Sequence, residues 1–132
     1  MYQHADQTWK NKPKCLSEHH QELFAKRLHE YVAEKDLQRV VIIYHGGEPL
    51  LFGVENIIRF TELLRATLST LHCEVSFGIQ TNGTLLKEEH LKKFREHNIS
   101  VSLSIDGPKE MQDQHRLDLK NRPTFDKVYA AL

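Results

Sequence analysis

Three apolar segments of strand character in this chain each stop at a short polar turn that contains a glycine. The segments are residues 40–45, 75–79 and 99–105, and the turns are residues 46–49, 80–83 and 106–108. In a parallel α/β sheet or barrel, ligands bind beyond the carboxyl ends of the strands, where backbone N–H groups and loop side chains converge. Three such strand ends therefore predict one shared site.

Segments with helical periodicity separate the three strands. Amphipathic patterns cover residues 17–35, 54–71 and 88–97, and a further helix is expected to begin at residue 124. Ser17 is placed to cap the first helix and Asn98 to end the third. Strands joined by helices of this length are parallel, with right-handed crossovers. The sequence thus predicts an α/β fold with three parallel strands and flanking helices.

Alternation of polar and apolar residues in two of the strands limits the possible sheet architectures. Ser100, Ser102 and Ser104 alternate with apolar residues, and the second strand repeats this pattern. A strand buried on both faces of a parallel sheet would be continuously apolar. A polar face suits a barrel interior that holds water or a ligand. An antiparallel sheet with one solvent face is the alternative, and the intervening helices count against it.

Charge and hydropathy exclude several classes of partner. The 132 residues carry 18 basic and 18 acidic side chains, and no basic patch with interleaved aromatics is apparent. Nucleic acid is therefore not an expected partner. No apolar segment is long enough for a membrane span or a signal peptide. We expect one soluble, cytoplasmic domain with no membrane partner.

Cysteine usage limits the metal chemistry of the chain. Cys15 and Cys73 are its two cysteines, and neither has a second cysteine at CxxC or CxxxC spacing. An iron–sulfur cluster normally requires three or four thiolates. The histidines also lack a specific metal-binding spacing. We therefore assign no metal ligand in this chain.

Four motifs together resemble the radical S-adenosylmethionine (radical SAM) superfamily. They are GGEPLL at residues 46–51, QTNGTLL at 80–86, SIDGP at 104–108 and DQHR at 113–116. Their order and spacing are similar to those of the SPASM-type branch, which includes anaerobic sulfatase-maturating enzymes and radical peptide maturases. The resemblance covers nearly the whole chain, whereas GGEP alone would be a weak signal.

The resemblance implies a fold, a chemistry and partners. The fold is a segment of a partial (β/α)6 barrel. In an intact relative, an electron from a 4Fe-4S cluster cleaves S-adenosylmethionine to a 5′-deoxyadenosyl radical, which abstracts hydrogen from a peptide or protein side chain. A flavodoxin or ferredoxin is the implied electron donor. The protein holds the reactive carbon near the substrate while the cofactor supplies the chemistry.

One family feature is missing from the sequence. The family binds its cluster through a CxxxCxxC loop after the first barrel strand, and these residues contain no such loop. We expect residues 1–132 to be a partial core domain without the first strand, the cluster loop, the last strands and the cysteine-rich C-terminal domain. Such a segment would be inactive by itself. The alternative is a non-catalytic remnant that acts at most as a peptide-binding module.

The resemblance assigns cofactor contacts to eight residues: Gly46, Gly47, Glu48, Pro49, Gln80, Asn82, Ser104 and Arg116. The two glycines let the main chain approach a ligand, and the turn carbonyls with the Glu48 carboxylate offer acceptors for the methionyl ammonium group. Gln80 and Asn82 have amides suited to cofactor or substrate contacts. A purely structural turn is the alternative for the Gly-Gly-Glu-Pro segment.

Ser104 and Arg116 are expected at the carboxylate end of the cofactor. A serine hydroxyl donates to a carboxylate or ribose oxygen, and an arginine binds a carboxylate through two parallel hydrogen bonds. The alternatives are a cavity-lining serine and a surface arginine. Thr81 and Gly83 are interpreted as turn-shaping residues, and Asp106 as a capping residue of its turn rather than a catalytic group. No catalytic residue is assigned.

Overall fold

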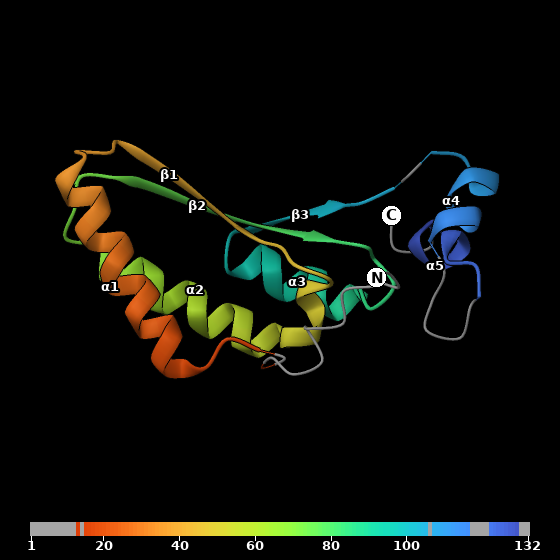
Figure 1. Cartoon of the computed structure of the whole chain (residues 1–132), viewed down its shortest axis with the longest axis horizontal. Coiled ribbons are helices and arrows are strands. Elements are labelled where there is room, and N and C mark those ends of the chain that lie inside the picture. The colour runs from red at the N-terminus through yellow and green to blue at the C-terminus, as the bar shows by residue number, and fades with distance from the viewer. Residues whose placement is uncertain (1–12, 14, 106, 117–121, 130–132) are drawn as a thin grey trace. The chain divides into compact units, whose positions relative to one another are not determined.

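Three parallel strands with flanking helices form the fold, as the sequence predicts. The computed structural model describes residues 13, 15–105, 107–116 and 122–129. Its elements, in chain order, are α1 (Glu18–Glu34), β1 (Arg39–Tyr44), the 3-10 helix η2 (Pro49–Phe52), α2 (Val54–Leu68), β2 (Glu74–Thr81), α3 (Glu88–Glu96), β3 (Ile99–Leu103), α4 (Lys109–His115) and α5 (Phe125–Tyr129) (Figure 1). The strand order in the sheet is β1-β2-β3. Among the described residues, no helix is both long and apolar enough to cross a membrane.

The predicted helix boundaries hold where a capping signal is present. The Ser17 side chain accepts a hydrogen bond from the His20 backbone N–H and begins α1. Asn98, with φ 49°, adopts the left-handed conformation directly after α3 and leads into β3. The end of α2 was predicted too late, because Leu71 N–H bonds to the Leu68 carbonyl in a turn. The capping residues thus determined the boundaries better than apolar periodicity did.

Two elements were not predicted from the sequence. The η2 helix begins at Pro49, and the Glu48 side chain caps it by accepting from Leu50 N–H. The α4 helix follows the third turn, where the segment lacks a clear apolar period. Short helices like these take their stability from capping and tertiary contacts, so periodicity does not reveal them. The predicted last helix is present as α5, and residues 130–132 lie outside the described residues.

The pairing of β2 with β3 sets the polar face of the sheet. The two strands are parallel, with Gly78 opposite Ser100 and Gln80 opposite Ser102. Ile79 is opposite Val101 in the same register. Because successive side chains point to opposite faces, the glycine, glutamine and serines share one face and the apolar residues share the other. The alternation predicted from the sequence is therefore confirmed in the paired strands.

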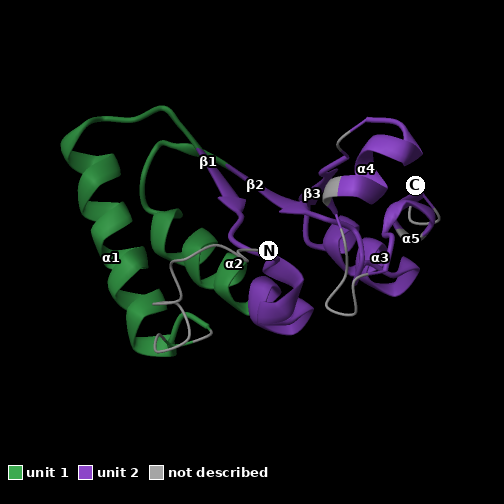
Figure 2. Ribbon diagram, turned by 45° about the vertical axis from the view of Figure 1, so that its right-hand side comes forward, with its two compact units in different colours: residues 1–40, 59–75 green, residues 41–58, 76–132 purple. Residues whose placement is uncertain are grey.

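The chain divides into two compact units, shown in different colours in Figure 2, and each is described by itself. Unit 1 comprises residues 1–40 and 59–75. Within it, the Phe24 and Phe60 rings meet edge to face at 5.9 Å, and Arg59 pairs with Glu18 at 3.0 Å. These two contacts join α1 to the C-terminal part of α2.

The buried stripe of α1 is narrower than its apolar pattern predicts. Ala25 and Val32 are each 2% exposed and Gln21 is 4% exposed, whereas Phe24 and Tyr31 are 45% and 54% exposed. Residues at this spacing lie along one side of a helix. The apolar set on α1 spans a wider arc than this stripe, so part of the predicted core face is exposed.

Unit 2 comprises residues 41–58 and 76–132 and contains the motifs singled out above. Helix α3 packs against β3, and Phe94 of α3 is fully buried. Phe77 and Ile79 of β2 and Ile99 of β3 are 1–3% exposed, so they form one apolar layer with Phe94. Burying a side chain of this size contributes roughly 1.5–3 kcal/mol. This layer supports the strand ends that carry the motifs.

Polar contacts join α4 to α5 in unit 2. The Asp113 carboxylate accepts from Phe125 N–H at 3.0 Å and caps α5. Thr124, 4% exposed, donates its hydroxyl to the Arg116 carbonyl at 2.7 Å. Lys109 pairs with Asp126, and this hydrogen bond raises the pKa of Lys109. The backbone at Arg116 is thus held between two short helices.

We expect Gly83→Ala to lower the free energy of unfolding by about 1–3 kcal/mol. Gly83 has φ +75°, and an added Cβ would lie 3.1 Å from Leu103 Cδ2 and 3.3 Å from Val128 Cγ1. Gly47→Ala is the matched control, because Gly47 lacks a positive φ and has nothing within 4 Å of its added Cβ. The control should change stability by less than about 0.5 kcal/mol. Urea midpoints measure both, and equal midpoints would contradict the assignment.

Candidate functional site

A buried carboxylate connects the turn after β1 to the end of β2. Glu48 is 7% exposed. Its Oε1 accepts from the Thr81 hydroxyl at 2.7 Å and from Leu50 N–H at 3.0 Å. Its Oε2 accepts from Asn82 N–H at 2.9 Å. Three donors therefore satisfy this carboxylate inside the chain, which a buried charge requires.

The turn after β2 is built around Thr81 and Asn82. The Thr81 hydroxyl donates to Glu48 and also accepts from Gly83 N–H at 3.1 Å. The Asn82 side-chain oxygen accepts from both the backbone N–H and the hydroxyl of Thr84, at 2.9 and 2.7 Å. The turn-shaping role predicted for Thr81 is thus confirmed. Because the Asn82 oxygen is used in the turn, its amide NH2 is the group left for a ligand.

The end of β3 joins the same edge of the sheet. Ser104 N–H donates to the Thr81 carbonyl at 2.8 Å, and the Gln80 amide nitrogen donates to Ser104 Oγ at 2.7 Å. Hydrogen bonds therefore connect the three strand ends: Glu48 connects the first to the second, and residues 80 and 81 connect the second to the third. The prediction that these strand ends converge is confirmed.

The predicted cofactor residues lie on different sides of the sheet. Gln80 and Thr81 are consecutive in β2, so their side chains point to opposite faces. Glu48 bonds Thr81 and therefore lies on the apolar side, whereas Ser104 bonds Gln80 on the polar side. Gln80, Asn82 and Ser104 are half-buried, a state that leaves them accessible to a ligand. Pro49 is buried as the first residue of η2.

The Gly46-Gly47 turn is exposed and faces open space. Gly46 has φ +131°, a conformation that favours glycine, while Gly47 lacks a positive φ. No described atom lies within 4 Å of a Cβ built on either residue. Packing in the described chain therefore does not explain the glycine at position 47. The open space beside this turn would admit a ligand close to the backbone.

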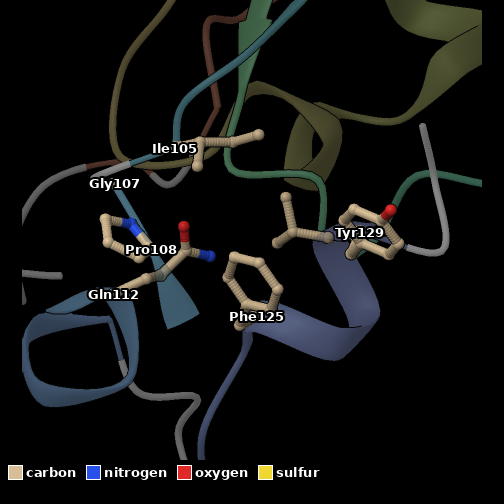
Figure 3. A pocket seen from close by; sticks show the side chains of 7 residues that line it. Ile105, Gly107, Pro108, Gln112, Phe125 and Tyr129 are labelled. Atoms are coloured by element: carbon tan, nitrogen blue, oxygen red, sulfur yellow. The ribbon is translucent and has the colours of Figure 1, made fainter. Parts of the chain in front are cut away.

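A small apolar pocket lies directly beyond Ser104. It has a volume of about 230 Å3, and its lining includes Ile105, Pro108, Phe125 and Tyr129 (Figure 3). Gln112, fully buried, contributes an amide side chain to this lining. Arg116 follows α4, where its N–H donates to the Gln112 carbonyl at 2.7 Å. Residues of the third motif thus line this pocket, and the fourth motif follows Gln112 along the chain.

The comparisons agree on one family. Residues 9–132 match the Radical SAM superfamily. A cysteine-type anaerobic sulfatase-maturating enzyme of Clostridium novyi is 36% identical over 91 residues, which is 69% of this chain and 24% of that protein. A serine-type enzyme of Bacteroides thetaiotaomicron is also 36% identical, over 81% of this chain and 25% of that protein. The chain belongs to the radical SAM superfamily.

A solved structure of native anSMEcpe with bound AdoMet and Kp18Cys peptide shares the fold. The TM-score is 0.76 at 32% sequence identity, and the match covers 88% of this chain and 31% of that chain. A structure of native anSMEcpe with bound AdoMet matches with a TM-score of 0.75. Our chain spans about a quarter of the length of the curated relatives named above.

S-adenosylmethionine and a 4Fe-4S cluster are the cofactors of intact members of this family. The donor set at the strand ends fits S-adenosylmethionine, because it combines the Ser104 hydroxyl, the Asn82 amide and open backbone at the Gly-Gly turn. The cluster does not fit these residues. Cys15 and Cys73 are free thiols, and no group of three or more metal-binding side chains occurs in the described part of the chain.

Anaerobic reconstitution of the 132-residue chain with iron and sulfide should give no stoichiometric cluster. Two cysteines leave a cluster under-ligated, since a cluster normally requires three or four thiolates. Iron and sulfide analysis with absorbance spectroscopy measures the outcome. About four irons per chain would contradict this prediction.

Glu48→Gln should lower the free energy of unfolding by about 1.5–3 kcal/mol. The NH2 group of the new glutamine would replace one acceptor oxygen of the carboxylate. It would then face a donor from Leu50, Thr81 or Asn82 and leave that donor without an acceptor. Glu22→Gln is the matched control, because Glu22 is exposed on α1. Chemical denaturation of both variants measures the difference. A Glu48→Gln midpoint equal to that of Glu22→Gln would show that the carboxylate does not hold the turn.

Proposed function

We propose that this chain forms the S-adenosylmethionine-binding part of a radical SAM enzyme that oxidatively modifies a peptide or protein side chain. The observation that carries the proposal is the hydrogen-bonded convergence of three strand-end motifs beside an open Gly-Gly turn. Family membership supports the cofactor. The peptide bound in a structural relative supports the class of substrate.

The methionyl ammonium group is proposed to bind at the turn after β1. Gly46 and Gly47 are exposed, and their carbonyls are the proposed acceptors there. The Glu48 carboxylate already accepts three hydrogen bonds from the chain, so its proposed part is to hold this turn in place and add negative potential beneath it. A methyl group at position 47 would occupy the space that the ligand needs.

The carboxylate or ribose of the cofactor is proposed to bind between the ends of β2 and β3 and the end of α4. Ser104 offers a hydroxyl and Asn82 offers an amide NH2 group. Arg116 provides a guanidinium, which suits a carboxylate through two parallel hydrogen bonds. The bound cofactor supplies the radical chemistry, and these residues orient it and exclude water.

The proposed partners of the whole protein are the peptide or protein substrate and a flavodoxin or ferredoxin as electron donor. The cluster that receives the electron requires ligands from outside these 132 residues. The second candidate is a non-catalytic peptide-binding module. The two candidates differ in whether the chain binds S-adenosylmethionine.

Arg116→Lys should weaken S-adenosylmethionine binding by about 1.5–3 kcal/mol, the range for a hydrogen bond to a charged group. A lysine keeps the positive charge but cannot make the two parallel hydrogen bonds that an arginine makes to a carboxylate. Arg27→Lys is the matched control, because Arg27 is 74% exposed on α1. Isothermal titration calorimetry of the folded variants measures the change. Unchanged affinity in Arg116→Lys would make Arg116 a surface arginine, and no binding by the unmodified chain would refute the proposal.

A further inference from the structure

Gln80 and Ser104 form a side-chain pair on the polar face of the sheet. The Gln80 amide nitrogen lies 2.7 Å from Ser104 Oγ. The register explains the contact, because Gln80 is opposite Ser102 and Ser104 lies two residues further along the same face. Ser104 N–H is anchored on the Thr81 carbonyl at 2.8 Å. Ser104 is therefore held by one backbone hydrogen bond, to Thr81, and by one side-chain hydrogen bond, from Gln80.

This contact decides the direction in which Ser104 can donate. A serine hydroxyl has one hydrogen and two acceptor lone pairs. The Gln80 N–H occupies one lone pair, so the hydroxyl hydrogen points away from Gln80. No described residue accepts that hydrogen, although Ser104 is half-buried. Because Ser104 is only half-buried, this hydrogen can be donated to water or to a ligand.

We propose that Gln80 is a positioning residue that acts through Ser104 and does not itself hold the ligand. Its N–H fixes the Ser104 hydroxyl as an outward donor, so the site selects a ligand with an oxygen acceptor at that point. On the proposed function, on which this inference rests, that acceptor is a carboxylate or ribose oxygen of S-adenosylmethionine. Direct contact of Gln80 with the ligand is the competing role.

A double-mutant cycle separates these two roles, because residues that act as one unit are not additive. Gln80→Met keeps the length and the neutral charge but removes the N–H donor. Ser104→Ala removes the hydroxyl. Affinity for S-adenosylmethionine is measured by isothermal titration calorimetry for the unmodified full chain, both single variants and the double variant, after urea midpoints confirm that each is folded.

We expect Gln80→Met to weaken binding about 2- to 5-fold and Ser104→Ala about 2- to 12-fold, as for the loss of a neutral hydrogen bond. The double variant should bind as weakly as Ser104→Ala alone. Gln38→Met, which removes an amide bonded to Asp36, is the matched control and should leave affinity unchanged.

Two results would overturn the inference while leaving the proposed function standing. One is a double variant weakened by the product of the two single effects, which would mean that Gln80 contacts the ligand itself. The other is unchanged affinity in Gln80→Met. A failure of the unmodified chain to bind S-adenosylmethionine would refute the proposed function and this inference together.

Discussion

The buried Glu48 carboxylate is the interaction on which the candidate site depends. It begins η2, bonds the Thr81 hydroxyl at the end of β2 and receives the Asn82 N–H from the following turn. A buried charge is costly unless donors surround it. Those donors come from segments more than thirty residues apart, so satisfying the carboxylate requires the turns after β1 and β2 to meet.

The two faces of the strands carry different contacts at the candidate site. On the apolar side, Thr81 and Glu48 hold the turns against a core that contains Phe77 and Phe94. On the polar side, Gln80 and Ser104 leave hydrogen-bonding groups available. Adjacent residues of β2 therefore serve different purposes, because alternate side chains of a strand point in opposite directions.

Family membership and local geometry limit the function in different ways. The radical SAM match and the relatives define the cofactor class, whereas the geometry shows which hydrogen bonds the side chains at the strand ends already make. The chain spans about a quarter of those relatives, so the complete reaction involves residues outside it. The residues of the candidate site, by contrast, all lie within unit 2.

Much of the architecture could be predicted from the sequence. Apolar alternation and helical periods predicted three parallel strands with a polar face, and Ser17 and Asn98 marked helix boundaries. These features depend on residues that are close together in the chain, so local sequence patterns predict them. The short helices η2 and α4 escaped prediction because capping and tertiary contacts, rather than periodicity, stabilise them.

The hydrogen-bond partners of the site residues could be assigned only from the tertiary structure. The sequence by itself determined that Glu48, Gln80, Asn82 and Ser104 lie at strand ends and that these ends converge. Only the folded chain decided that the Glu48 carboxylate bonds Thr81 while Gln80 bonds Ser104. The physical reason is that hydrogen-bond partners distant in the chain are chosen by strand register and burial, which no local pattern contains.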